Sequence, residues 1–257
     1  MKKLFSSGIF ALMFLVSCSE NDLFPVTEDM SIAEVSPATR SSSTYSLSSI
    51  VSTISLSATD QSSVNKILNE LQSEPLGKGY KPVFKKIATK KVSSISRGNT
   101  GTAEASYNPA TDAISLKTGS DIAATQIQEE FIHAAQDRTY SNGISQYAGK
   151  TGTPNIEFEA KIIQELIYCA NGYGFGGLGS GPTHADEYSR WIVLLCEDGL
   201  FDEKFPSMSE VLNTKYSNYG YYDFMGFFKT KSPSYNYSII NGLQPIFLDY
   251  VNKNYGL

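Results

Sequence analysis

Residues 128–136 read QEEFIHAAQ and place two adjacent glutamates close to a histidine. Because an α-helix turns by about 100° per residue, Glu129 and His133 lie one turn apart on the same face. Carboxylate oxygen and imidazole nitrogen are both zinc ligands, so the pair can hold one ion. Glu130 follows the first ligand and is placed to activate water. The spacing predicts a zinc site with Glu129 and His133 as ligands and Glu130 as the catalytic base. The alternative interpretation is a solvated polar helix face.

A third metal ligand is expected on the following helix, where Glu157 and Glu159 are the candidates. Residues at i and i+2 of a helix point about 200° apart, so only one of these carboxylates can face the ion. Helix phase favours Glu159, which lies on the apolar face. A carboxylate there needs a partner, because burying it alone is costly. Both residues therefore remain candidates.

The segment 128–136 resembles the active helix of the H-E-x-x-H zincins. It is more similar to the E-E-x-x-H-A-x-Q or H-E-x-x-H-A-x-Q segment of metallopeptidase-like lipoproteins of gut Gram-negative bacteria, and the resemblance covers residues 103–170. It implies a zincin-like domain that acts on a protein or peptide substrate. It also implies Glu157 as the third ligand, since related zincins carry this glutamate in an E-x-x-A-D pattern. Lys161 stands where that pattern has an acid.

The chain departs from the family at Glu129, which stands where the family has a histidine. An anionic ligand lowers the positive charge at the ion, so bound water becomes less acidic. Catalysis is therefore expected to be weakened or lost, while metal binding is retained. The substitution Glu129→His restores H-E-x-x-H and is expected to raise the metal affinity.

The chain begins MKKLFSSGIFALMFLVSC, with a basic start, an apolar run and a cysteine, which is typical of a secretory signal over residues 1–17. The sequence Leu15-Val16-Ser17-Cys18 resembles the lipobox of bacterial lipoproteins, which implies acylation of Cys18. We therefore expect a lipid-anchored protein at the outer membrane or cell surface. Cleavage by the general signal peptidase, giving a soluble secreted protein, is the alternative.

Composition excludes some function classes. A net charge of −5 leaves no basic patch for nucleic acid, so no nucleic-acid partner is expected. Cys169 and Cys196 either pair as a disulfide in an oxidising compartment or are buried as small apolar residues. His184, in GPTHADEY, either starts a helix or joins the site.

Hydrophobic periodicity predicts an α+β fold, with an early β-hairpin and small sheet and a mostly helical C-terminal half. A Ser/Thr-rich tether is expected over 18–57 and a zincin-like domain over 58–257, although LSSIVSTISLS within the tether alternates like a first strand. A helix is expected from about Asp60 to before Pro75, strands in YKPVFKKIATKKVSSI, and a hairpin around Asn108–Asp112. Helices are then expected over 121–138, 155–170, 183–197 and 241–254, with a shorter one over 207–215.

A second function class is a noncatalytic surface-binding lipoprotein. The segment YSNYGYYDFMGFF is rich in Tyr and Phe, which suit ligand or partner binding where they are exposed. At least half of these side chains are expected in the core. Metal content distinguishes the two classes.

Overall fold

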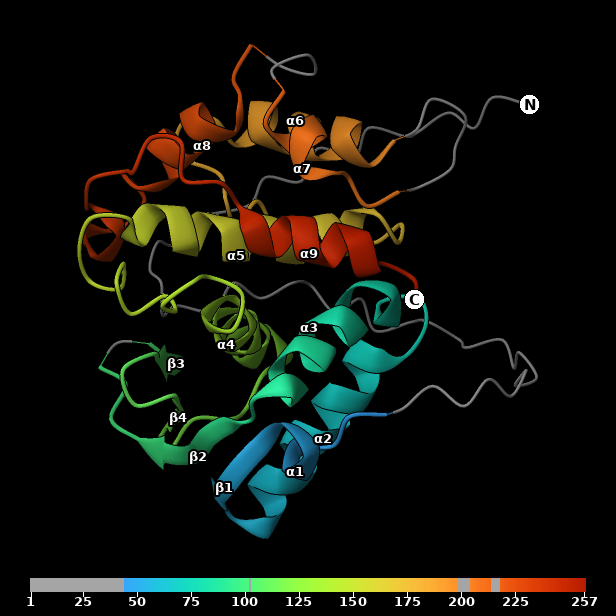
Figure 1. The fold of residues 1–257 in the computed structure, drawn as a ribbon, viewed down its shortest axis with the longest axis vertical. Coiled ribbons are helices and arrows are strands. Elements are labelled where there is room, and N and C mark those ends of the chain that lie inside the picture. Colours follow the sequence, from blue (N-terminus) through green and yellow to red (C-terminus); the bar gives the residue numbers. More distant parts are fainter. Residues whose placement is uncertain (1–43, 102, 198–203, 214–217) are drawn as a thin grey trace.

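The computed structural model describes residues 44–101, 103–197, 204–213 and 218–257 (Figure 1). The expected signal segment, Cys18 and most of the expected tether lie outside these residues, so the acylation of Cys18 stays a prediction. Within the described part, no helix combines the length and apolar character that crossing a bilayer requires.

A small mixed sheet occupies the N-terminal half of the described chain. Its strands are β1 (Val51–Ser55), β2 (Val92–Gly98), β3 (Ala105–Asn108) and β4 (Ala113–Lys117). The order across the sheet is β1-β2-β4-β3. The strand β2 pairs parallel with both β1 and β4, whereas β3 pairs antiparallel with β4. The predicted hairpin is therefore confirmed, and β3 is an edge strand.

Helices make up most of the remaining described structure, as the α+β prediction requires. They are α1 (Leu47–Ile50), α2 (Ala58–Gln72), α3 (Gly77–Thr89), α4 (Ala124–Asp137), α5 (Thr153–Cys169), α6 (Ala185–Cys196), α7 (Met208–Val211), α8 (Tyr221–Phe228) and α9 (Ile246–Asn254), with a 3₁₀ turn η2 (Pro233–Tyr235). The five helices expected beyond residue 120 are present, although the last begins later than expected and the shorter one spans a single turn.

The folded part begins before the expected tether boundary at residue 57. Leu47 and Ile50 are buried in α1, and Val51 begins the strand that pairs with β2. The alternative interpretation of this segment as a first strand is correct for Val51–Ser55, whereas Leu47–Ile50 form a short helix. Buried apolar residues there outweigh a composition rich in serine, because they complete the sheet and its core.

The prediction of strands in YKPVFKKIATKKVSSI is wrong over its first part, which forms α3. Tyr80, Val83, Phe84 and Ile87 are buried, and they recur at helical spacing along one face. This period outweighs the β-branched composition. Only the end of the segment forms the strand β2.

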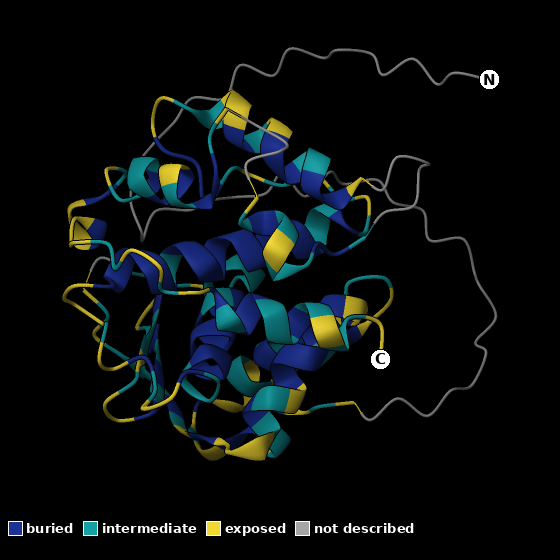
Figure 2. Ribbon diagram, turned by 45° about the horizontal axis from the view of Figure 1, so that its top comes forward, coloured by how far each residue is buried: buried dark blue, intermediate teal, exposed yellow. Residues whose placement is uncertain are grey.

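The helix α4 lies at the centre of the fold, between the sheet on one side and α5 on the other (Figure 1). Phe131 of α4 contacts Phe84 of α3 edge to face, with ring centroids 5.5 Å apart. Figure 2 shows α4 and α5 mostly in the colour of buried residues, which agrees with the buried residues along both helices. The predicted active helix is therefore rigidly packed.

The helix α8 was not predicted, because its sequence was interpreted as a binding segment. Tyr221, Phe224, Met225 and Phe228 are buried, and Phe224 stacks on Trp191 of α6 at 4.8 Å between ring centroids. Another contact, between Tyr221 and Phe158 of α5, has centroids 5.0 Å apart. Half of the aromatic residues of this segment that the structure describes are therefore buried in the core, as expected, and the other half are partly buried.

Candidate metal centre

The polar face of α4 is buried, so the interpretation of it as a solvated face is wrong. Glu130 and His133 are each only 7 % exposed, and Gln136 is fully buried. The helix α5 covers this face, because α4 and α5 pack against each other. Burying ionisable side chains is costly without partners, so each of them must be paired.

Three of the predicted metal ligands converge between α4 and α5. The imidazole Nε2 of His133 lies 3.7 Å from Glu129 Oε1 and 3.4 Å from Glu157 Oε2. One ligand atom from each residue lies within 4.8 Å of the other two. Glu129 and His133 come from adjacent turns of α4, as predicted, and Glu157 comes from the second turn of α5.

The geometry of this Glu129–His133–Glu157 cluster fits a metal ion. Ligand atoms about 2.0–2.1 Å from a zinc ion lie about 3.4 Å apart in a tetrahedral site. The two distances to His133 Nε2, 3.7 and 3.4 Å, are close to that spacing. The Glu157 side chain is 26 % exposed, so the cluster is accessible from solvent on its side. The residues therefore can hold a metal ion, whose identity the geometry leaves open.

Each of the two candidate ligands on α4 has a second partner, which leaves one of its atoms facing the cluster. His133 Nδ1 lies 2.8 Å from Gln136 Oε1, so an N–H at Nδ1 donates to the amide and leaves the Nε2 lone pair inward. The ammonium of Lys161 donates to Glu129 Oε2 at 2.6 Å, while Glu129 Oε1 faces His133. Contacts of this kind orient ligands in metal sites.

The charges of the cluster stabilise one another. Burial by itself would lower the pKa of His133, but the carboxylates of Glu157 and Glu129 raise it well above its ordinary value. Burial would likewise raise the pKa of Glu129, but Lys161 and His133 lower it to about 2. Without a metal ion, the two carboxylates of the cluster are therefore paired with two cations, protonated His133 within the cluster and Lys161 beside it.

The predicted base Glu130 lies beside the cluster, facing the sheet. Its burial raises the pKa of the carboxyl to about 8, and Glu129 and Glu157 add to the rise, while His133 opposes it. A backbone hydrogen bond from Tyr107 links this carboxyl to the edge strand β3. A carboxyl with such a pKa can accept a proton near neutral pH and hold it.

Glu159 does not face the cluster, so its prediction as a metal ligand is wrong. Its carboxylate is fully buried and accepts four hydrogen bonds. The donors are Gln136 Nε2 at 2.7 Å, the Tyr140 hydroxyl at 2.9 Å, and the backbone N–H groups of Phe247 at 2.9 Å and Leu248 at 3.0 Å. The last two belong to the first turn of α9, so Glu159 caps that helix. A carboxylate on the apolar face of α5 was expected to need a partner, and its partners are these hydrogen-bond donors, not a metal ion.

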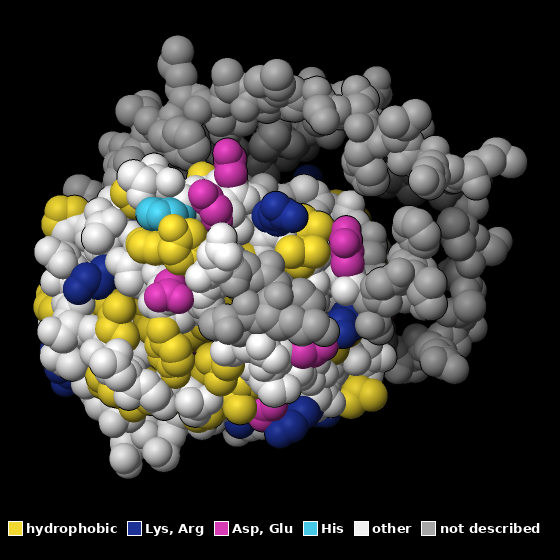
Figure 3. Space-filling view, turned by 90° about the horizontal axis from the view of Figure 1, so that it is seen from above, with side chains coloured by type: hydrophobic (Ala, Val, Ile, Leu, Met, Phe, Trp, Pro, Cys, Tyr) yellow, Lys and Arg dark blue, Asp and Glu magenta, His cyan; other side chains and the backbone are white. Residues whose placement is uncertain are grey.

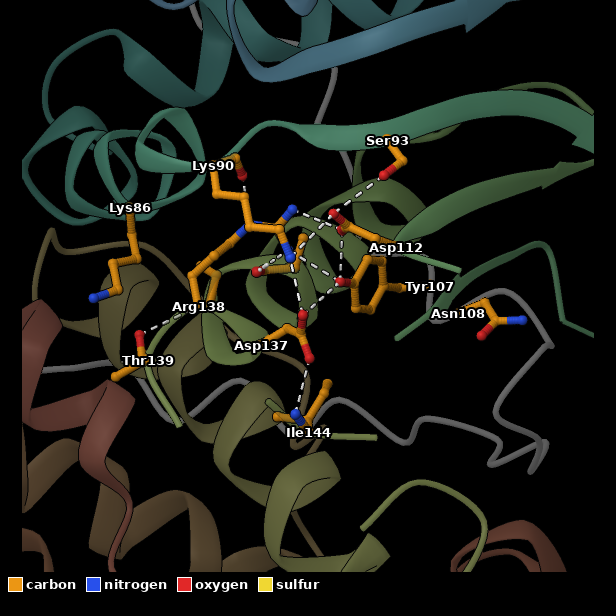
Figure 4. A network of polar contacts seen from close by, with 12 residues as sticks. Lys86, Lys90, Ser93, Tyr107, Asn108, Asp112, Asp137, Arg138, Thr139 and Ile144 are labelled. Carbon is orange, nitrogen blue, oxygen red and sulfur yellow. Dashed lines mark hydrogen bonds and ion pairs between the residues drawn. The ribbon is translucent and has the colours of Figure 1, made fainter. Parts of the chain in front are cut away.

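A network of polar contacts fixes the C-terminal end of α4 to the hairpin (Figure 4). Arg138 donates to Asp112 Oδ1 at 2.6 Å and to the Tyr107 hydroxyl at 3.0 Å. The same hydroxyl donates to Asp112 Oδ1, and Asp137 Oδ1 accepts from the backbone N–H of Ile144 at 2.9 Å. This network sets the position of α4 against β3.

His184 is the N-cap residue of α6, as one of the two interpretations expected, and it is not in the cluster. Its ring stacks on Phe227 with centroids 3.8 Å apart and contacts Tyr219 edge to face. Figure 3 shows a histidine among hydrophobic side chains on this face of the molecule. Cys169 and Cys196 form no disulfide, so the interpretation of them as small apolar residues is correct for Cys196, which is buried.

Two contributors to the site were missed by the sequence interpretation. Gln136 was given no role, and Lys161 was noted only as a departure from a pattern. Gln136 is three residues after His133, a spacing that brings helical side chains together and gave a usable signal. The contact of Lys161 with Glu129 crosses between helices, so no local pattern indicates it. No family model, curated protein or solved structure matches the chain.

Proposed function

We propose that the protein is a zincin-like metallopeptidase that binds one zinc ion through Glu129, His133 and Glu157. The observation that carries the proposal is the convergence of these three side chains, within 4.8 Å of one another, from the E-E-x-x-H helix and the helix after it. Two carboxylates and an imidazole form a donor set that zinc accepts. Burial and the neighbouring charges also shift the pKa values of the side chains at the site. This supports a functional role, since perturbed pKa values cluster at active sites.

The residues of the chain divide the chemistry between them. A bound zinc ion would supply Lewis acidity and a water of lowered pKa. Glu130 stands next in sequence to the ligand Glu129, and its raised pKa of about 8 suits a general base that must hold a proton. Gln136 holds His133 through Nδ1 and so keeps Nε2 directed at the cluster.

The edge strand β3 supports a protein or peptide as the substrate. Within the described sheet, β3 pairs with β4 on one side and with no described strand on the other, although the backbone of Tyr107 is already hydrogen-bonded to Glu130. An extended peptide can add to such an edge by main-chain hydrogen bonds. The backbone contact between Tyr107 and Glu130 places this edge beside the proposed base.

We further propose that acylation of Cys18 anchors the protein at the outer membrane or cell surface, and that peptides are met there. The lipobox-like Leu15-Val16-Ser17-Cys18 supports this placement. Replacing Cys18 with Ala should move the protein from the membrane fraction to the soluble fraction. Unchanged membrane association would contradict the anchor without touching the metal site.

The proposed function is tested by metal content and peptide hydrolysis in matched variants of the full chain. We expect about one zinc ion per wild-type chain by elemental analysis, lost in His133→Ala. Glu130→Gln should retain the ion and lose hydrolysis of a peptide library, because it removes the base and leaves the ligands. Absence of stoichiometric metal after exposure to zinc would refute the proposal. Metal binding without any hydrolysis would favour the noncatalytic lipoprotein instead.

A further inference from the structure

Lys161 is held against the cluster by an ion pair that leaves the inward oxygen of Glu129 available. Its ammonium lies 2.6 Å from Glu129 Oε2, and its side chain is 11 % exposed. The other carboxylate oxygen, Oε1, is the one that faces His133 Nε2. Because the lysine and the cluster use different oxygens, Lys161 does not have to leave when an ion binds.

The charge of the ligands changes when Lys161 is counted with them. Glu129 and Glu157 are anions and a metal-bound His133 is neutral, so the three ligands alone carry two negative charges. The adjacent ammonium of Lys161 reduces this to one. Catalytic zinc sites with two histidines and one glutamate also carry one negative charge. Glu130 is common to all variants considered below, so its charge cancels in their comparison.

We propose that Lys161 is the counter-charge of the site, which makes the Glu129–Lys161 pair electrostatically equivalent to a neutral histidine ligand. This inference rests on the proposed function and deepens it. It means that the carboxylate at position 129 does not weaken the Lewis acidity of the ion in the way the sequence alone indicates. The chain has exchanged one neutral ligand for an anion and a cation.

The inference reverses the expected effect of Glu129→His. That substitution removes an anion but leaves the Lys161 ammonium beside the ion, so the ligands and Lys161 together become neutral. Repulsion between the ion and this ammonium, which the Glu129 carboxylate no longer offsets, then lowers the metal affinity. The double substitution Glu129→His with Lys161→Met returns the site to one negative charge and restores the affinity.

The test is a calorimetric zinc titration of the full chain in wild type, Glu129→His, Lys161→Met and the double variant, with Lys161→Arg as the charge-conserving control. We expect Glu129→His to bind zinc at least about tenfold more weakly than wild type, because the Lys161 ammonium then repels the ion. The zinc affinity of the double variant should be restored to within about tenfold of wild type, and that of Lys161→Arg should stay within the same range. Lys161→Met should bind most tightly, because it leaves two negative charges.

The outcomes separate this inference from the proposed function. Glu129→His binding zinc as tightly as wild type, or Lys161→Met binding it more weakly, would overturn the counter-charge while leaving the metal site intact. Failure of wild type to bind zinc would overturn both. If Glu129→His does not fold, as judged by circular dichroism, Glu129→Gln removes the same charge with nearly the same shape. The same order of affinities is then expected for Glu129→Gln with and without Lys161→Met.

Discussion

The buried carboxyl of Glu159 makes a prediction about stability that does not depend on any metal ion. Burial raises the pKa of this carboxyl from 4.5 to about 7, although four hydrogen-bond donors oppose the rise. A factor of ten in a proton equilibrium corresponds to about 1.4 kcal/mol. Keeping Glu159 ionised above pH 7 therefore costs the folded state about 3 kcal/mol relative to the unfolded chain.

The direction of the change in stability with pH depends on whether the folded or the unfolded state binds the proton more tightly. The folded pKa of Glu159 lies above the unfolded one, so between pH 4.5 and about 7 the folded state holds more protons. The contribution of Glu159 to the free energy of unfolding is greatest below pH 4.5. It is lost as the pH rises through about 7.

The variant Glu159→Gln has a similar shape and no proton to titrate. The substitution changes the free energy of unfolding by an amount that does not depend on pH. It also removes the contribution that depends on the protonation of Glu159. We expect wild type to lose about 3 kcal/mol relative to Glu159→Gln between pH 4.5 and about 7. Urea unfolding with a chelator present, analysed by linear extrapolation at each pH, measures the difference. A stability difference that does not change with pH would refute this reasoning.

Further predictions concern the cluster, the network at the end of α4 and the cysteines. Zinc affinity should rise about tenfold per pH unit up to the raised pKa of His133, because this imidazole must be neutral to bind the ion. Binding should therefore release about one proton, which calorimetry in buffers of different ionisation enthalpy counts. Arg138→Met should lower the free energy of unfolding by about 3–5 kcal/mol in urea, since the Arg138 side chain is 3 % exposed and its loss leaves Asp112 without its closest cation. A thiol reagent should label half-buried Cys169 in the native protein and buried Cys196 only after unfolding, as mass spectrometry of the peptides would show.

The elements that position the site followed from local patterns. Periodicity predicted α4 and α5, and the turn residues at Asn108–Asp112 predicted the hairpin, because these signals depend on neighbours in sequence. The same reasoning failed for α3, where β-branched residues at helical spacing gave two conflicting signals. It failed for α8 as well, because an aromatic segment has the same composition in a core as on a binding surface.

The candidate ligands were predictable only in part. Glu129 and His133 are one turn apart, so their convergence is a property of the helix alone. The choice between Glu157 and Glu159 depends on how α5 is rotated against α4 and on the arrival of α9, whose first turn takes up Glu159. That contact joins residues far apart in the chain, and no pattern within α5 contains it. Helix phase correctly indicated that Glu159 needs partners, but it did not indicate that α9 supplies them.

The cluster is difficult to explain as a stabilising device. Buried ion pairs contribute little relative to apolar side chains of similar size, since desolvation offsets their attraction. Here Glu129, His133 and Lys161, each at most 15 % exposed at the side chain, lie between two helices that also bury many apolar side chains. Folding alone would favour leucine or methionine at these positions. Sequences depart from that preference mainly at functional sites, where the chemistry requires charged groups. The low stability expected of such a cluster is therefore an argument for metal binding, and it applies whether or not hydrolysis accompanies it.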